Sequence, residues 1–314
     1  MADLGLRGAI ESSHRNAEPT AAPSLRLAAI GARIATAATR LDPVVAICAA
    51  LALGLILAAL FAPSIAPFDP DAQRLLARLK PPVGFPGADT KHLFGTDQLG
   101  RDILSRCLYG LRLSLFLALF GAVVGLLLGA GVGFIAGLVG GSVDSLLMSI
   151  VDVKLSLPFT LVALFVIAFA GTDIGVLVVV LGLAYWAHFA RLVRAQVVAL
   201  RELPYIEAAR AAGATDFRIA VRHLLPNIVS PVVVMFTLNI SNLILLESAL
   251  SFIGLGVQPP TATLGSMVGQ GRDYMASAPW VVAMPAILIV LVALVVMLLG
   301  DALRDRFDVK LRER

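Results

Sequence analysis

The stretch LSLFLALFGAVVGLLLGAGVGFIAGLVGGSV, residues 113–143, contains no Asp, Glu, Lys or Arg. A helix needs about 20 mainly apolar residues to cross the hydrocarbon core of a bilayer, so this stretch alone predicts a membrane span. Five further stretches are also charge-free and apolar enough to span. The six expected spans are residues 43–62, 113–137, 147–170, 174–190, 228–252 and 280–300. All six are expected to be helices, because they lack the alternating pattern of barrel strands and only helices or closed barrels satisfy the backbone in lipid.

The composition of the whole chain agrees with a membrane protein. Of its 314 residues 59% are hydrophobic and only 15% are charged, whereas about a quarter of an average soluble domain is charged. Such a chain cannot coat a globule of this size with charge, which argues against a soluble enzyme, a disordered protein and a nucleic-acid binder. The net charge is only +4, and a basic excess in a membrane protein is better explained by loops that set its orientation.

Two segments flank or interrupt the spans without crossing the membrane. Residues 248–271 are charge-free but rich in Gly, Pro, Ser and Thr, which predicts a loop outside the bilayer or packed against protein at its edge. Residues 1–42 are too long for the n-region of a signal peptide and are partly charged, so the first span is not expected to be cleaved and residues 1–42 are expected to form a cytoplasmic N-terminal tail. Within this tail, residues 21–40 could form an interfacial helix or stay poorly ordered, and the sequence leaves both open.

The distribution of Lys and Arg predicts the orientation. With both termini in the cytoplasm, the cytoplasmic segments carry 17 of these residues and the outer segments carry 8. Arg106 and Arg112 conflict with this assignment, since they precede the second span on the outer side. An amphipathic segment at 102–112, lying in the outer interface, would accommodate them.

Motifs for catalysis are missing from the sequence. No G-x-x-x-x-G-K-[ST] phosphate loop occurs, so the chain does not bind ATP through that motif, and no His or Cys spacing suggests a metal site. The two cysteines, Cys48 and Cys107, are too few for a disulfide framework. We therefore expect no enzyme activity in this chain.

A glycine recurs at every fourth position of the second span. The repeat consists of Gly121, Gly125, Gly129, Gly133, Gly137 and Gly141. Small residues at this spacing let two helices approach closely, either within this bundle, which we favour, or at a contact with another subunit.

Charged side chains inside the spans are costly and usually have a function. Glu247, in the fifth span, could line a passage or contact a partner subunit. It could equally pair with Ser241, Asn242 or a neighbouring helix. Asp152 and Lys154, in the third span, are better explained by structural pairing.

The segment between the fourth and fifth spans, residues 191–226, reads RLVRAQVVALRELPYIEAARAAGATDFRIAVRHLLP. Pro204 can start a short Ala-rich helix and Gly213 can end it. Thr215 is a suitable N-cap for a second helix, and Pro226 marks the return to the membrane. A short helix with small residues on its face is a rigid knob that can dock in a groove.

This segment resembles the E-A-A loop of ABC importer permeases. The family pattern, E-A-A-x3-G-x9-I-x-L-P, is matched by Glu207, Ala208, Ala209, Gly213 and the Leu-Pro pair at 225–226. Only His223 departs from it, since it stands where Ile is usual.

Two further stretches resemble the dipeptide, oligopeptide and nickel permeases within this family. FGTDQLGRD at 94–102 is similar to the stretch that precedes their second span, and DALRDRFD at 301–308 is similar to their C-terminal tail. Both occur in the second of the two permeases of such systems. The resemblance covers about residues 40 to 310.

The resemblance implies an all-α membrane protein with the type I ABC importer permease fold, six spans and both termini inside. A first span and outer loop would occupy 43–112, and the core with the E-A-A loop at 191–227 would occupy 113–303, followed by a cytoplasmic tail at 304–314. The residues implied to couple with an ATPase are Tyr205, Ile206, Glu207, Ala208, Ala209, Arg210, Ala212, Gly213 and Asp216.

The resemblance also implies a set of partners in the bacterial inner membrane. A homologous permease would complete a heterodimeric pore, two ABC ATPases would bind ATP and Mg²⁺, and an extracytoplasmic protein would deliver the substrate. Di- or oligopeptides are the expected substrate, with nickel and glutathione-like ligands as alternatives. A secondary transporter is the main rival class, but it would typically show inverted repeats or broken helices with polar residues at mid-membrane.

Overall fold

The computed structural model describes residues 43–312, and the side chains of residues 43–305. The chain divides into two units between Ala46 and Ile47, so the arrangement given below concerns residues from Ile47 onward. Within the described range the chain forms helices and turns, with one isolated bridge between Thr96 and Asp102 and no longer strand. The helices are α2 (Pro43–Leu60), α3 (Ala62–Ile65), α4 (Ile103–Val139), α5 (Gly141–Ser156), α6 (Phe159–Ala170), α7 (Ile174–Arg201), α8 (Pro204–Ala211), α9 (Asp216–Ile219), the π-helical η2 (Ala220–Leu224), α10 (Leu225–Phe252), α11 (Leu264–Gly271) and α12 (Trp280–Arg312), with 3₁₀ turns at Leu75–Ala77 and Arg272–Tyr274.

The expected spans correspond to long apolar helices. Five helical segments in the described range are long and apolar enough to cross a membrane, namely α2, α4, α7, the α9–α10 segment and α12. The sixth candidate is the pair α5 and α6, which is bent by 91° at a short break. The prediction of an all-helical membrane protein is therefore confirmed.

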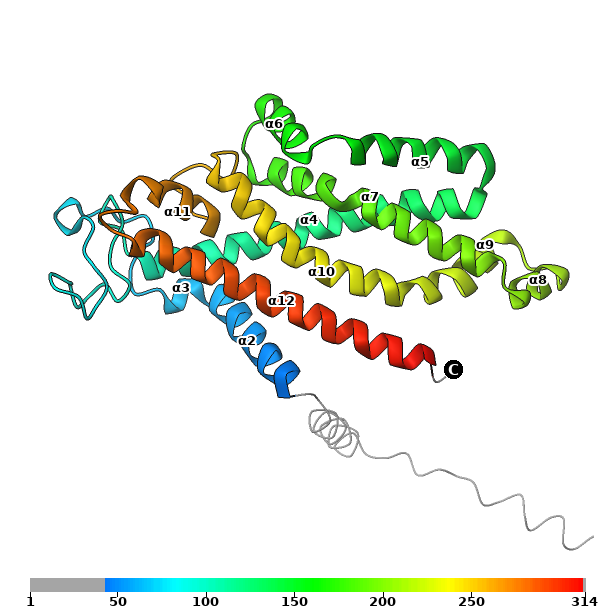
Figure 1. The fold of residues 1–314 in the computed structure, drawn as a ribbon, viewed down its shortest axis with the longest axis horizontal. Coiled ribbons are helices and arrows are strands. Elements are labelled where there is room, and N and C mark those ends of the chain that lie inside the picture. The colour runs from blue at the N-terminus through cyan, green and yellow to red at the C-terminus, as the bar shows by residue number, and fades with distance from the viewer. Residues whose placement is uncertain (1–42, 313–314) are drawn as a thin grey trace, which may run out of the picture. The chain divides into compact units, whose positions relative to one another are not determined.

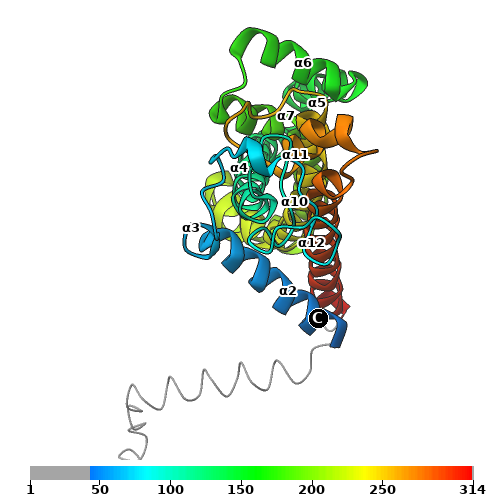
Figure 2. The same ribbon diagram turned by 90° about the vertical axis from the view of Figure 1, so that its left-hand side faces the viewer.

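Helices α4, α7, α10 and α12 run alongside one another and form the bundle (Figure 1). Helix α8 lies at one end of this bundle and α11 lies at the other, and we call these the α8 end and the α11 end (Figure 1). Figure 2, which looks along the bundle, shows α4, α7 and α10 close together with α5 and α6 at one side.

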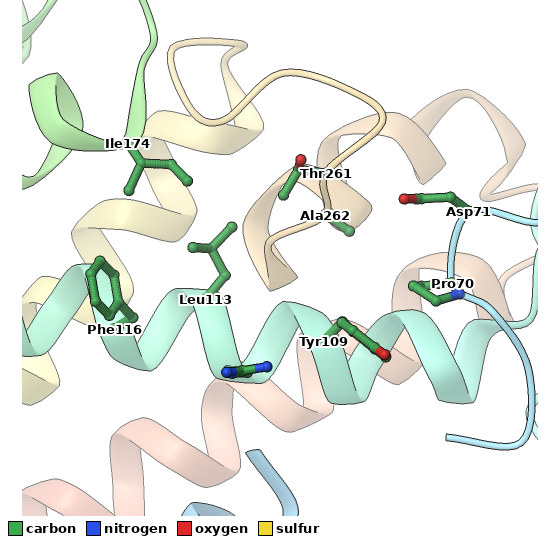
Figure 3. A pocket seen from close by; sticks show the side chains of 9 residues that line it. Pro70, Asp71, Tyr109, Leu113, Phe116, Ile174, Thr261 and Ala262 are labelled. Carbon is green, nitrogen blue, oxygen red and sulfur yellow. The ribbon is translucent and has the colours of Figure 1, made fainter. Parts of the chain in front are cut away.

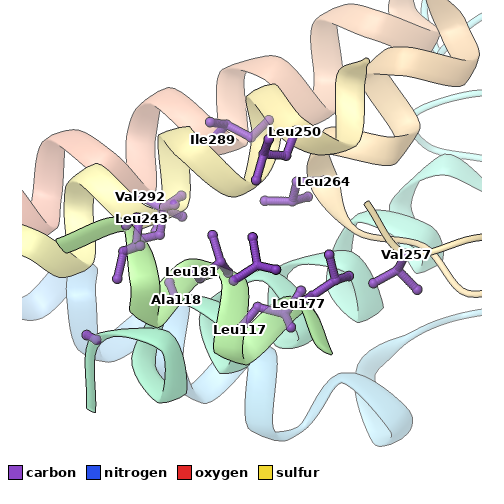
Figure 4. Close-up of a cluster of buried hydrophobic side chains, with 14 of the residues drawn as sticks. Leu117, Ala118, Leu177, Leu181, Leu243, Leu250, Val257, Leu264, Ile289 and Val292 are labelled. Atoms are coloured by element: carbon purple, nitrogen blue, oxygen red, sulfur yellow. The ribbon is translucent and has the colours of Figure 1, made fainter. Parts of the chain in front are cut away.

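Buried apolar side chains of α2, α4, α6, α7, α10, α11 and α12 form one hydrophobic cluster, part of which Figure 4 shows. Helix α4 contributes Leu117, α7 contributes Leu181, and α10 contributes Leu243, all at most 1% exposed. Because lipid tails are as apolar as leucine, this contact is stabilised by close packing of the helices rather than by removal of apolar surface from water.

The glycine repeat of α4 faces α7. A methyl group added at Gly129 would lie 2.1 Å from the Trp186 carbonyl oxygen, and one at Gly133 would lie 2.2 Å from that of Ala190. Gly121, Gly125 and Gly137 are similarly close to α7, where an added Cβ would lie 2.7 to 2.9 Å from Leu181, Gly182 and Val197. The structure thus places these five glycines in a contact within the chain. Gly141 lies apart from this contact, with open space around it at the start of α5.

The prediction of one continuous helix over 147–170 was wrong. Helix α5 ends at Ser156, α6 begins at Phe159, and the two are bent by 91°. Pro158 lacks the N–H that a helix interior needs, and its ring disfavours helical geometry at the preceding residue. Leu157 accordingly adopts an extended conformation.

The expected interfacial segment at 102–112 is instead the start of α4. Asp102 caps the helix, because its carboxylate accepts the Ser105 backbone N–H at 2.8 Å. Helix α4 then continues for 37 residues to Val139. Arg106 is 1% exposed and packs inside the protein, so its charge is not accommodated at the surface of the membrane.

The expected loop at 248–271 includes a helix. Helix α10 continues to Phe252, and α11 begins after Thr263, whose side chain forms a capping box with Ser266. This part of the chain packs against α4, α10 and α12, in agreement with the alternative that it lies against protein.

The fourth and sixth helices are longer than expected. Helix α7 continues beyond residue 190 to Arg201, and α12 continues beyond residue 300 to Arg312, so most of the expected tail at 304–314 is helical. The expected N-terminal tail, residues 1–42, lies outside the described residues.

We predict that Gly129→Leu disrupts the contact between α4 and α7, because the added side chain would collide with the Trp186 backbone. The yield of the folded protein after detergent extraction should fall severalfold. Gly131→Leu is the matched control, since Gly131 lies two residues away with open space around it. Equal yields of the two variants would contradict the packing role.

Candidate functional site

Helix α8 has the boundaries that the sequence predicts. Pro204 is its first residue, and only two residues separate it from the end of α7. Gly213 follows its C-cap with φ +83°, a backbone conformation that favours glycine. The N–H of Gly213 donates to the Arg210 carbonyl at 2.9 Å and the N–H of Ala214 donates to that of Ala209 at 3.0 Å, which is a Schellman C-cap.

One apolar side chain holds α8 against the bundle. Ile206 is fully buried, and a hydrophobic cluster surrounds it. The other fully or nearly buried members are Val193, Val197, Ile219, Leu224 and Ile228. The cluster includes residues of α7, α9, η2 and α10, so α8 is a fixed knob rather than a free loop.

The rest of α8 and its following turn face outward. The exposed members of the predicted coupling set are Tyr205, Glu207, Ala208, Arg210, Ala212, Gly213 and Asp216. Ala209 is half-buried, and Ile206 points into the protein, so Ile206 anchors the knob and is not part of its outer surface. Arg210 pairs with Asp216 at 3.4 Å.

The outer surface of the knob also includes a large apolar residue that the sequence reasoning missed. Phe217 is 77% exposed and directly follows Asp216. The available signal was a phenylalanine directly after the predicted N-cap Thr215 and Asp216, in a segment assigned to the space between two spans. Thr215 caps the helix that begins there, as predicted, by accepting the Arg218 N–H at 3.3 Å.

A cavity of about 470 Å³ lies behind α8. Its lining comprises Gly137, Gly140, Asp144, Arg194, Val198, Arg201, Glu202, Glu207 and Arg210. Arg194 donates two hydrogen bonds to the Asp144 carboxylate, at 2.5 and 2.6 Å, and Arg201 donates to the Gly137 carbonyl at 2.6 Å. The cavity is therefore bordered by charged groups of both signs.

Glu247 is satisfied within the chain. It is 4% exposed and accepts hydrogen bonds from the hydroxyls of Ser251, at 2.7 Å, and Ser114, at 3.1 Å. Ser114 lies on α4, so the partner is a residue of a neighbouring helix, one of the alternatives considered above. Ser241 instead donates to the Ala293 carbonyl at 2.7 Å.

The charges of α5 pair with α7. Arg191 contacts Asp152 at 2.6 Å, and the Lys154 ammonium donates to the Ala184 carbonyl. These contacts agree with the structural pairing expected for Asp152 and Lys154.

A buried ionic network organises the α11 end, and the sequence reasoning did not find it. The Asp97 carboxylate accepts the backbone N–H groups of Leu99 and Arg101 at 2.9 Å and the Arg101 Nε–H at 2.6 Å. Arg106 lies 3.7 Å from the same carboxylate. All three charged side chains are at most 5% exposed, so Asp97 balances two buried guanidinium groups.

The same network fastens the segment before α4 to that helix. His92 contacts Asp102 at 2.9 Å, and the Ser105 hydroxyl accepts the Phe68 N–H at 3.1 Å. The Trp280 indole donates to the Thr96 carbonyl at 3.4 Å, which adds the start of α12. The FGTDQLGRD stretch at 94–102 is therefore a structural clamp.

A second cavity, of about 410 Å³, also lies at the α11 end (Figure 3). Tyr109, Leu113 and Phe116 line it along one side of α4, and Asp71 and Thr261 reach it from two loops (Figure 3). Its lining is mostly apolar, with Asp71, Tyr109 and Arg112 as its ionisable members. Within the described residues no group of three or more metal-ligating side chains gathers.

Two family models match the sequence. One, described as a binding-protein-dependent transport system inner membrane component, matches residues 129–312. The other, described as the N-terminal transmembrane domain of oligopeptide transport permease C, matches residues 40–82.

Curated relatives match most of the chain. A putative peptide transport system permease protein of Brucella suis is 42% identical over 83% of this chain and 86% of its own length. The dipeptide transport system permease protein DppC of Escherichia coli K12 is 45% identical over 81% of this chain and 85% of its own. The di/tripeptide transport system permease protein DppC of Pseudomonas aeruginosa is 40% identical over 82% and 85%.

A solved structure shares the fold. Inward-facing MetNI, a methionine ABC transporter, contains a chain that aligns with a TM-score of 0.52 at 22% identity, covering 63% of this chain and 94% of that one. The fold is thus that of the type I ABC importer permeases, as expected from the E-A-A loop.

We predict that Asp97→Asn destabilises the protein strongly, because it leaves Arg101 and Arg106 buried without a counter-charge. Loss of one partner of a buried pair typically costs about 3–5 kcal/mol, so the midpoint of thermal unfolding in detergent should fall markedly. Asp69→Asn is the control, since Asp69 is exposed and accepts only the Asp71 N–H. A wild-type unfolding midpoint for Asp97→Asn would show that the network is not needed.

Proposed function

Since the chain belongs to the family of binding-protein-dependent transport system inner membrane components, we propose that it forms half of a pore that imports di- or oligopeptides. It is a multi-pass protein of the bacterial inner membrane and a permease subunit of an ABC importer. The peptide substrate is supported by the names of its relatives, which are peptide, dipeptide and di/tripeptide permeases.

The family implies ATPase subunits and a second permease as partners. In the proposed complex a homologous permease supplies the other half of the pore, two ABC ATPases bind ATP and Mg²⁺, and an extracytoplasmic protein delivers the peptide. This chain itself performs no chemistry.

The observation that carries the mechanism is the anchored helix α8. Its exposed face is small and rigid, Ile206 fixes it to the bundle, and only two residues join it to α7. A displacement of α8 by a closing ATPase therefore moves α7, and α4 follows because its glycines lie against the α7 backbone. In this way ATP-driven closure would rock the bundle and open the pore outward.

This mechanism requires the α8 end to face the cytoplasm. The excess of Lys and Arg in the segments assigned to that side, 17 against 8, supports this orientation with both termini inside. The α11 end, with its clamp around Asp97, would then face the delivering protein.

The substrate is tested by purifying the tagged chain with its partners, isolating the extracytoplasmic protein that accompanies it, and measuring the ligands of that protein. A dipeptide or longer peptide is expected as the tightest ligand. Nickel or a glutathione-like ligand as the tightest ligand would reject the peptide assignment while leaving the importer function in place.

We predict that Glu207→Lys uncouples ATP hydrolysis from transport, because it reverses the charge on the exposed face of α8 while leaving Ile206 in place. Gly213→Asp should have the same effect, because residue 213 adopts a left-handed backbone conformation that is strained for a residue with a side chain. Both variants should insert in the membrane normally but lose ligand-stimulated ATPase activity and uptake in proteoliposomes.

Asp305→Lys, an equal charge change at an exposed residue in the C-terminal part of α12, is the control and should leave both activities intact. Normal ligand-stimulated ATPase activity in Glu207→Lys would contradict the proposal that α8 couples the ATPase to the bundle.

The orientation predicts opposite labelling of two cysteine substitutions. Phe217→Cys, at the α8 end, should react with a membrane-impermeant maleimide only after cells are permeabilised. Leu76→Cys, in the fully exposed turn before α4, should react in intact cells. The native Cys48 and Cys107 are buried and give a low background. The reverse pattern would require both termini to lie outside.

A further inference from the structure

Helices α4 and α5 meet at a corner made of two glycines. Helix α4 ends at Val139, and Gly140 and Gly141 have φ +73° and +57° before α5 proceeds. Glycine adopts this conformation at little cost and has no Cβ to restrict its φ and ψ angles, so the two-glycine connection by itself can bend.

One arginine of α7 holds the α4 side of this corner. The last four carbonyl groups of a helix have no partner within that helix. Gly137 provides one of them, and the Arg201 guanidinium donates to it at 2.6 Å. A cation at a helix C-terminus is also favoured by the helix dipole.

A second arginine of α7 holds the α5 side. Asp144 lies in the first turn of α5, and Arg194 donates to both of its oxygens at 2.5 and 2.6 Å. The Asp144 side chain is 17% exposed and that of Arg194 is 38% exposed. A bidentate pair of this kind fixes orientation as well as distance.

Both arginines belong to the part of α7 that leads into α8. Arg201 is the last residue of α7, and Arg194 lies two turns before it. Both line the cavity of about 470 Å³ that Glu207 and Arg210 of α8 also line. The glycine corner, the two arginines and the coupling helix therefore border one space.

We propose that Arg194 and Arg201 are positioning residues that clasp the α4–α5 corner to the stem of α8, so that a displacement of α8 moves α4 and α5 as one body. This rests on the proposed function, in which α8 receives the movement of an ATPase. Without the clasp, the two-glycine corner and the first turn of α5 could shift relative to α7, while Val151, Asp152 and Lys154 would still hold the later turns of α5 to α7.

The test uses the complete transporter, purified with its ATPases and second permease and reconstituted in proteoliposomes with the delivering protein. The variants are Arg194→Gln and Arg201→Gln. Four quantities are measured: the yield of the complex, the basal ATPase rate, the fold-stimulation of that rate by the loaded delivering protein, and the amount of peptide imported per ATP hydrolysed. We expect normal yield and basal rate, with the fold-stimulation and the peptide imported per ATP both reduced on the order of tenfold.

Rescue separates positioning from general stability. Exchanging the charges with Asp144→Arg and Arg194→Asp should restore much of the stimulation that either change alone removes. Arg201→Lys keeps a cationic donor for the Gly137 carbonyl and should retain more stimulation than Arg201→Gln.

The matched control lies on the same two helices. Arg191 pairs with Asp152 at 2.6 Å across α7 and α5, but both side chains are more than half exposed, and Asp152 lies eight residues beyond Asp144 on α5. Arg191→Gln should leave stimulation and import unchanged, as expected for an exposed pair.

Wild-type stimulation and import per ATP in Arg194→Gln and Arg201→Gln would overturn the clasp. A reduced yield of complex in both, with a normal yield for Arg191→Gln, would also overturn it, since the arginines would then serve folding. If Glu207→Lys uncouples and the clasp variants do not, only the clasp fails. If Glu207→Lys has no effect, the proposed role of α8 fails first.

Discussion

The close approach of α4 and α7 is the constraint on which the rest of the structure depends. At Gly129 and Gly133 an added methyl group would lie little more than 2 Å from a carbonyl oxygen of α7. In lipid, helix association depends on such packing, because the lipid tails are themselves apolar and the hydrophobic effect does not drive helices together. The contact runs from Gly121 to Gly137, over about 24 Å of helix at 1.5 Å per residue, so α4 and α7 behave as one rigid pair.

The charged groups of the described chain lie mainly beyond the two ends of this pair. At the α11 end Asp97 balances Arg101 and Arg106, and at the α8 end Arg194 and Arg201 hold the start of α5 and the end of α4. Between these ends Glu247 is buried and accepts hydrogen bonds from the Ser114 and Ser251 hydroxyls, and Lys154 of α5 donates to the Ala184 carbonyl of α7. The ion pairs described above therefore lie mainly near the ends of the pair, where they fix the adjoining segments.

The sequence was sufficient to predict the parts of the structure that depend on residues close together along the chain. Charge-free length located five of the six spans as single helices, Pro204 and Gly213 bounded α8, and the spacing of glycines marked the tight face of α4. It was insufficient where the partner is distant in sequence. Nothing local shows that Arg106 packs inside, because its counter-charge comes from the clamp at 94–102 and not from α4 itself. Ile206 could not be told from the other members of α8 by its sequence position, because the residues that bury it, such as Ile228, belong to other helices.

The third span illustrates a limit of counting apolar residues, because length alone does not make a helix straight. Pro158 divides the stretch, and each half buries little: only Val151 of α5, and Ala163 and Ile167 of α6, are buried within the chain. Helix α6 is apolar on every side, with Phe165 66% and Phe169 80% exposed. Such a helix is unfavourable in water, so lipid or another protein must cover it. Like α2, of which only Cys48 and Ala59 are buried, the α5–α6 pair is thus a part of the described chain whose burial is completed from outside, and the two arginines of α7 fix the end of the pair at which α5 begins.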